Sequence, residues 1–112
     1  MHEVLIIGGG PGGLTAAMYC RMRKMSVVVV DAGRPGGQLI SLYGDKPVHD
    51  WPGYHHIIAN ELAGHFIEHA RALEVEIVAN QKITDLSVKG EEGFEAVAQD
   101  VVTREEHRYP AQ

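Results

Sequence analysis

The sequence predicts an α/β fold in which helices pack on a parallel β-sheet. Residues 4–7 and 26–30 form two short, mainly apolar runs, the pattern typical of strands buried on both faces of a parallel sheet. A glycine cluster follows the first run, and apolar residues at helical spacing lie between the two runs. Because parallel strands need a crossover connection, usually a helix, this order predicts a strand–helix–strand unit over residues 1–31.

The glycine cluster has the spacing G-x-G-x-x-G. Gly8 allows a tight turn, Gly10 lets the backbone approach a diphosphate, and Gly13 lets the next helix pack closely on the strand. The helix begins behind these glycines, and its unpaired N–H groups and positive dipole end form an anion site. The pattern therefore predicts a bound diphosphate. The apolar face of this helix is expected to contain Leu14, Ala17, Met18 and Met22.

Asp31 closes the second strand, at about the separation from the glycines where an acidic residue accepts hydrogen bonds from a ribose. Strand, glycines, helix, strand and terminal acid thus stand in the order of a dinucleotide-binding unit. An arginine at this end of the strand would accommodate a 2′-phosphate. The acid therefore favours FAD or NAD over NADP.

Length and composition narrow the class of protein. A chain of 112 residues makes one domain at most and is short for an enzyme that binds two nucleotides. The net charge is -5, and the sequence has no basic cluster beyond residues 21–24. We therefore expect no nucleic-acid-binding surface. The chain lacks a stretch of membrane-spanning length and a signal-peptide pattern, so we expect a cytoplasmic protein without membrane contact. The single cysteine, Cys20, suits a small buried side chain within the helix.

The middle of the chain predicts a long ligand-handling loop and a second crossover helix. Residues 33–55 are polar, rich in glycine and proline, and too long for an ordinary connection. Asn60 is expected to cap a helix over residues 60–73, which carries an apolar stripe. Residues 75–78 then predict a third strand, parallel to the first two and reached by a right-handed crossover.

After residue 80 the pattern changes to short alternating segments. We expect strands over residues 82–88, 94–99 and 101–109, with a turn around residues 90–93. These segments predict an antiparallel meander over residues 82–109. No closing helix and no further parallel strand are expected after it.

The second helix also contains a metal-site motif. His65 and His69 flank Phe66-Ile67-Glu68 in the pattern H-x-x-E-H, which is typical of one class of zinc peptidase. A zinc site needs a third protein ligand from a separate element, and the predicted nucleotide-binding framework offers none near this helix. We therefore expect two solvent-side histidines on an amphipathic helix and no metal site.

The glycine turn, Asp31 and the loop Gly36-Gly37-Gln38-Leu39 together resemble the N-terminal FAD-binding segment of the thioredoxin-reductase-like flavoproteins, over nearly the whole chain. Further matching residues look more like the ferredoxin–NADP⁺ reductases of thioredoxin-reductase type than like thioredoxin reductase itself. In the latter, an asparagine usually stands where this chain has Asp50. The further matches are Leu42-Tyr43, Lys46, Asp50 and Pro52-Gly53-Tyr54.

The resemblance implies an incomplete Rossmann-like FAD-binding domain and assigns roles to single residues. Gly10 through Gly13 would meet the FAD diphosphate, and Asp31 would hold the adenosine ribose. Gln38 and Tyr43 would lie along the flavin, since a glutamine can donate to and accept from the flavin edge and a tyrosine ring can stack on it. Ile83 would contact the adenine through its backbone. The implied FAD-binding residues are Gly8, Gly10, Pro11, Gly12, Gly13, Asp31, Gly37, Gln38, Leu39, Tyr43, Asp50 and Ile83.

The implied reaction is hydride transfer from NADPH to the flavin, followed by single electrons to ferredoxin. The flavin carries out this chemistry, so no catalytic side chain is expected. The NADPH domain and the C-terminal FAD segment of the resembling enzymes have no counterpart in this sequence. We therefore expect a truncated piece or a standalone half that lacks the nicotinamide site and holds FAD weakly. Its exposed strand edges favour self-association, as a dimer or by swapping.

Three alternatives remain for the function. The chain could be part of a thioredoxin reductase, with thioredoxin as the partner, or a standalone FAD-binding module that passes electrons to another protein. It could also be the NAD-binding Rossmann domain of a dehydrogenase. The antiparallel meander and the Gly36-Gly37-Gln38-Leu39 loop disfavour this last alternative.

Overall fold

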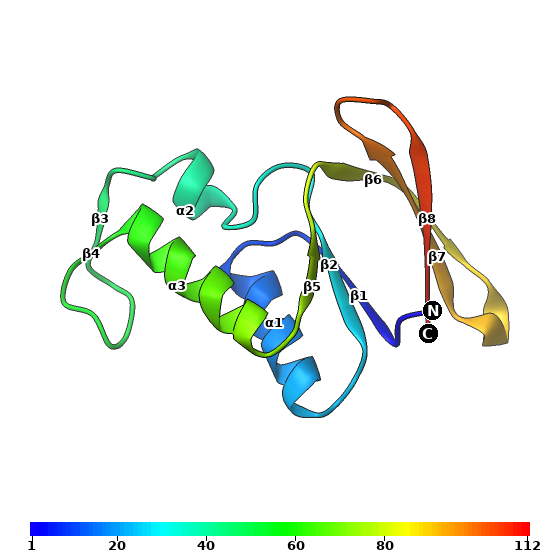
Figure 1. Ribbon diagram of the computed structural model, residues 1–112, viewed down its shortest axis with the longest axis horizontal. Helices are drawn as coiled ribbons and strands as arrows, with labels where there is room; N and C mark the ends of the chain where they lie inside the picture. Colours follow the sequence, from blue (N-terminus) through cyan, green and yellow to red (C-terminus); the bar gives the residue numbers. More distant parts are fainter.

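A parallel three-stranded sheet lies at the centre of the molecule (Figure 1). The computed structural model describes residues 1–112. The sheet contains β1 (Val4–Ile7), β2 (Val27–Val30) and β5 (Glu76–Val78), in the order β1-β2-β5. β2 pairs in parallel with both neighbours and all four of its residues are buried. The predicted order of strands and crossover helices is confirmed.

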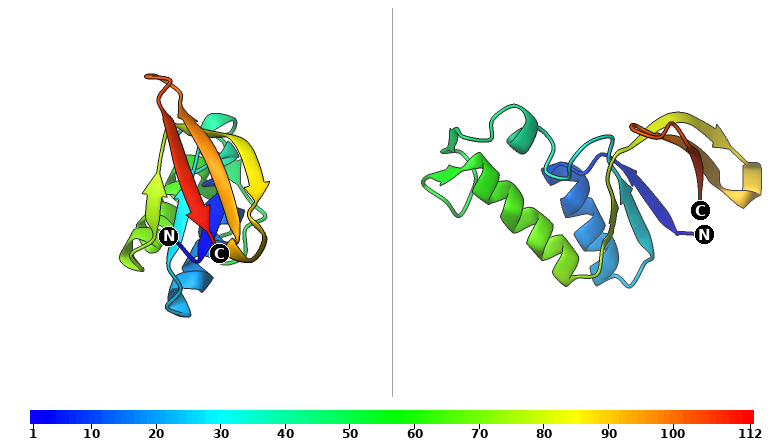
Figure 2. Two further views of the ribbon diagram at one scale, coloured as in Figure 1. Left: turned by 90° about the vertical axis from the view of Figure 1, so that its right-hand side faces the viewer. Right: turned by 45° about the horizontal axis from the view of Figure 1, so that its top comes forward.

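Two helices cover one face of this sheet, and the meander lies on the other side (Figures 1 and 2). The helices are α1 (Pro11–Met22) and α3 (Ala59–Ala72), which pack against each other. Most of the predicted helix faces are buried, but Met22 is 56% exposed and does not belong to the core. Cys20 is only partly buried against the core, rather than fully buried. The main hydrophobic core consists of Leu14, Ala17, Met18, Val27, Val29, Ala70 and Val75.

The start of α3 differs from the prediction. Asn60 is not the N-cap: the helix begins at Ala59, and no side chain caps it. The N–H groups of Ala59 and Asn60 instead donate to the carbonyls of Lys46 and Gly44, each at 3.0 Å. These carbonyls satisfy the first donors of the helix, so a capping side chain is unnecessary.

The segment predicted as a long loop contains regular structure. A one-turn helix, α2 (Gln38–Ser41), is followed by a short antiparallel pair, β3 (Pro47–Val48) and β4 (Ile57–Ile58). The pair joins the loop to the start of α3 and holds it at one end of the molecule (Figure 1).

The predicted meander is confirmed, but its third strand starts later than expected. The strands are β6 (Gln81–Val88), β7 (Phe94–Asp100) and β8 (Glu106–Ala111), with a short 3₁₀ helix, η1 (Gly90–Glu92), between the first two. Residues 101–105 form a turn, because one carboxylate oxygen of Asp100 accepts the N–H groups of Val102 and Thr103, each at 2.9 Å. The aspartate therefore replaces ladder hydrogen bonds that a strand at Val101 would have made.

The two ends of the chain lie close together (Figures 1 and 2). Ala111 forms an isolated parallel bridge with His2, and the N–H of Gln112 donates to the His2 carbonyl at 3.2 Å. This bridge and hydrogen bond join the end of β8 to the residues just before β1. No helix in the structure is both long enough and apolar enough to span a membrane.

Candidate functional site

The glycine turn lies between the end of β1 and the start of α1. Gly8 has a φ of 106°, a conformation that other residues rarely adopt, and its N–H donates to the Val30 carbonyl at 2.8 Å. A side chain on Gly13 would clash with the carbonyl oxygen of Gly8. Only glycine at these two positions lets the start of α1 pack against the carboxyl ends of β1 and β2.

The first turn of α1 is open to a ligand. Gly10 is the N-cap, Pro11 occupies the first helical position, and no side chain caps the N–H groups that follow. Apart from its chain neighbours and the backbone of α1 itself, no atom lies within 4 Å of where a side chain on Gly12 would begin. Unpaired N–H groups and the helix dipole favour an anion at this end. The turn can therefore hold a diphosphate, as its glycine spacing predicts.

Asp31 lies beside the turn, as predicted from its place after β2. One carboxylate oxygen accepts the N–H of Gly9 at 2.6 Å, and the other accepts the N–H of Gly33 at 2.8 Å. Two ionised oxygens offer about four acceptor sites in all, so two remain for hydroxyl groups of a ligand. The structure also shows a role that sequence reasoning missed, because Asp31 fixes the backbone of the turn.

The loop after β2 packs directly on the glycine turn. The N–H of Gly36 donates to the Gly9 carbonyl at 2.7 Å. Gly37 has a φ of 60°, and its missing side chain would lie 2.8 Å from the Cα atom of Gly10. Gln38 therefore begins α2 next to the glycine turn, with its side chain exposed. The structure brings these predicted residues together although they are distant from the turn in sequence.

Three other predicted residues share one hollow of about 580 Å³. Leu39, Tyr43 and Asp50 all line it. Lys46 also lines it, and its Nζ atom lies 5.8 Å from the centre of the Tyr43 ring. The sequence analysis assigned no site role to Lys46. In the structure it lies near Tyr43 because a tight turn joins the two residues, and the Lys46 N–H donates to the Tyr43 carbonyl at 2.8 Å.

Ile83 lies outside this hollow, in the meander. It is partly buried in β6, opposite Ala98. β6 starts beside Asp31, the residue that follows β2, because the N–H of Gln81 donates to the Asp31 carbonyl at 2.9 Å. Gln81 is buried, its amide nitrogen donates to Asp100 at 3.0 Å, and its Oε1 atom has no partner. No sequence pattern marked Gln81 as a site residue.

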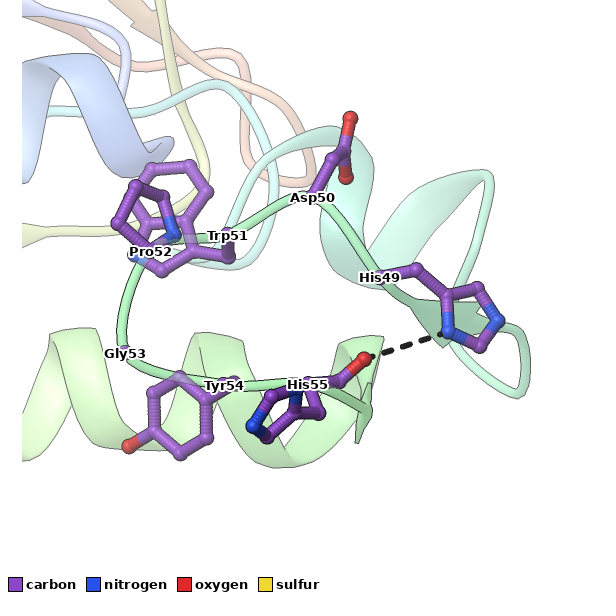
Figure 3. A pocket seen from close by; sticks show the side chains of 7 residues that line it. All are labelled: His49, Asp50, Trp51, Pro52, Gly53, Tyr54 and His55. Carbon is purple, nitrogen blue, oxygen red and sulfur yellow. Dashed lines mark hydrogen bonds between the residues drawn. The ribbon is translucent and has the colours of Figure 1, made fainter.

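A second hollow, of about 450 Å³, lies inside the curve of residues 49–55 (Figure 3). The curve is closed by a 3.4 Å contact between Nδ1 of His49 and the carbonyl of His55. Asp50 is the one predicted site residue that lines it. Its lining comes from consecutive residues of one exposed loop.

The H-x-x-E-H motif lies within α3. His65 and His69 lie on α3 with exposed side chains, and the structure contains no cluster of three or more His, Cys, Asp or Glu residues able to hold a metal ion.

Comparison with known proteins defines the class of domain. A family model described as the NAD(P)-binding Rossmann-like domain matches residues 6–69, and the chain belongs to this family. The match contains the glycine turn, Asp31, the loop and most of α3.

Several proteins that are similar to this chain are named as reductases. A ferredoxin–NADP reductase of Streptococcus gordonii is 39% identical over 95 residues, which are 84% of this chain and 29% of the relative. One of Listeria welshimeri is 32% identical over 97% of this chain and 32% of the relative. The structure of Lactococcus lactis thioredoxin reductase matches 98% of this chain and 33% of its own, with a TM-score of 0.81 and 28% identity. The chain thus spans about a third of these proteins. The resemblance found in the sequence is confirmed.

Proposed function

We propose that this chain is the FAD-binding part of a flavoprotein reductase of the ferredoxin–NADP reductase type. One observation carries the proposal: the Gly36–Gly37 segment packs on the glycine turn. This contact places three features next to one another, in the order Asp31, the start of α1, and Gln38. That is the order in which FAD presents its adenosine ribose, its diphosphate and its flavin.

The residues present fit FAD. The open side of Gly12 admits a diphosphate, and Asp31 has free acceptor sites for a ribose. Bound FAD would supply a ring that accepts a hydride and releases single electrons. The chain's own residues would bind it and orient it.

The activity of the relatives gives the proposed reaction. Two of the relatives compared above are named ferredoxin–NADP reductases. We propose that a protein of their length uses this domain to pass electrons from NADPH to ferredoxin, in the cytoplasm. The structural likeness to thioredoxin reductase makes thioredoxin the alternative partner.

A second candidate function is NAD binding. The description of the matching family names NAD(P), and a glycine turn with a terminal acid also suits NAD. The loop packed on the turn favours FAD, because NAD has no flavin to occupy the place beside Gln38. Titrations with the two nucleotides separate these candidates.

The test is a set of titrations of the purified chain with FAD, NAD and NADP, followed by flavin fluorescence or by calorimetry. We expect FAD to bind with a micromolar or weaker dissociation constant, and more tightly than NAD or NADP. Asp31→Asn removes an ionised acceptor, and hydrogen bonds to charged groups contribute roughly 1.5–3 kcal/mol, so FAD affinity should fall at least about tenfold.

Asp85→Asn is the matched control, because Asp85 is an exposed acid in β6 that forms no side-chain hydrogen bond or ion pair. Its FAD affinity should equal that of the wild type. Tighter binding of NAD than of FAD would overturn the proposal in favour of the second candidate. A folded chain that binds no nucleotide would overturn both.

A further inference from the structure

Two histidines of α3 and one methionine of α1 line the same small hollow. His65 and His69 are four residues apart, so they lie on one face of the helix. Together with Met18 they border a hollow of about 140 Å³. The nucleotide site does not use any of these three side chains. The hollow therefore combines two imidazoles and a thioether, contributed by two elements far apart in the sequence.

The donor atoms of these side chains are available. Neither imidazole takes part in a side-chain hydrogen bond or an ion pair with the rest of the chain, in contrast to His2, which contacts Glu76 at 2.7 Å. Met18 is 6% exposed and is held by the core between α1 and α3. Its thioether is thus fixed in place, while the imidazoles are free to bind a cation.

Aromatic side chains form the walls of the hollow. The Tyr54 ring stacks on His65, with ring centres 6.1 Å apart and planes 19° apart. Trp51 packs edge-on against Phe66, with centres 5.2 Å apart. Figure 3 shows that Trp51 and Tyr54 come from the loop that crosses α3. These rings place apolar surface next to the two exposed imidazoles.

We propose that Met18, His65 and His69 bind a monovalent copper ion. Thioether sulfur is a soft ligand that selects Cu⁺, and imidazole also suits copper. Zinc favours four-coordinate sites with at least three protein ligands of nitrogen, oxygen or thiolate, and this set has only two. His69 lies in the last turn of α3, where the helix dipole favours a cation.

The test is an anaerobic titration of the chain with Cu⁺ buffered by bicinchoninate, a coloured chelator. We expect one ion per chain and a change in the fluorescence of Trp51, the only tryptophan. Met18→Leu preserves side-chain volume and should lower Cu⁺ affinity at least tenfold. His65→Gln and His69→Gln should each do the same. X-ray absorption of the loaded chain should show one sulfur and two nitrogen ligands.

Three controls make the test decisive. Met22→Leu and His107→Gln change exposed residues elsewhere and should leave Cu⁺ affinity unchanged. Cys20→Ala removes the only thiol and should also leave it unchanged. Thermal unfolding should show that Met18→Leu remains folded. Cu⁺ binding that survives Met18→Leu or the double His65→Gln/His69→Gln change, or that is lost with Cys20→Ala, would overturn the proposal.

Discussion

Gly12 and Gly13 are adjacent in the first turn of α1, but a side chain would meet different surroundings at each. At Gly13 it would meet the carbonyl oxygen of Gly8, whereas at Gly12 nothing lies within 4 Å apart from its chain neighbours and the backbone of α1 itself. Gly13→Ala should therefore destabilise the fold by about 1–3 kcal/mol, the usual cost of overpacking. Gly12→Ala should stabilise it by roughly 0.5–1 kcal/mol, because alanine suits a helix better than glycine does.

The same pair tests the diphosphate site. Gly12→Ala should weaken FAD binding although the fold becomes more stable, because the new methyl group occupies the open side of the turn. Urea unfolding gives the stability of both variants, and an FAD titration gives the affinity. Equal FAD affinity in Gly12→Ala and the wild type would place the diphosphate elsewhere.

For single residues, the sequence predicts the structure correctly where the role of the residue depends on its local surroundings. The conformation of Gly8 and the approach of Gly13 follow from their spacing, since a tight turn into a helix leaves no room for side chains. The position of Asp31 beside the turn was predicted, but its hydrogen bond to the turn was not. Its hydrogen bond to the N–H of Gly9 depends on how β1 and β2 pair, which the sequence pattern does not show.

The turn between β7 and β8 gives a prediction at the scale of elements. The N–H groups of Thr103 and Val102 hold the pKa of Asp100 below its ordinary value. A lowered pKa in the folded state means that this carboxylate stabilises the fold above its unfolded-state pKa. That stabilisation is lost as the pH falls through the folded-state pKa. Acidification should therefore loosen this turn.

Asp100→Ala should lower the free energy of unfolding at pH 7, and the difference from wild type should shrink as the pH falls below 4. Urea unfolding monitored by circular dichroism at several pH values measures it. Asp85→Ala, which changes an exposed acid of β6, should show no such trend. A difference between Asp100→Ala and wild type that is independent of pH would show that the charge does not stabilise the turn.

Elements with a strong internal period were predicted well, whereas elements that depend on distant contacts were not. The two long helices and the three parallel strands follow from apolar spacing, which is a local property. β3 and β4 have only two residues each, too few to produce a period. Likewise, α3 starts one residue early because carbonyls of the preceding loop, and not Asn60, satisfy its first N–H groups.

At the scale of the whole molecule, the outer edge of β1 is largely unpaired. β1 pairs only with β2, and Ile7 is 54% exposed. Beside this edge, Leu5 and Ile7 share a hollow of about 340 Å³ with Leu86 and Phe94 from the meander. Apolar residues on an unpaired edge promote association between chains. We therefore expect the chain to self-associate as its concentration rises.

Ile7→Lys places a charge on this edge and should shift the sedimentation profile towards monomer. Val102→Lys is the control, because Val102 is 80% exposed at a turn and should leave association unchanged. Analytical ultracentrifugation over a range of concentrations measures both. A wild-type chain that stays monomeric at all concentrations would contradict the expectation.

The sequence by itself determined the parallel strand–helix–strand unit, the glycine turn, the acid after β2 and the change to an antiparallel meander. These features depend on backbone preferences and on periods of two to four residues, which a local stretch specifies. Only the tertiary structure decided that the Gly36–Gly37 segment packs on the glycine turn, that Gln81 lies against Asp31, and that Met18 shares a hollow with His65 and His69. Each of these joins residues distant in sequence, and long-range packing depends on the whole chain folding around one core.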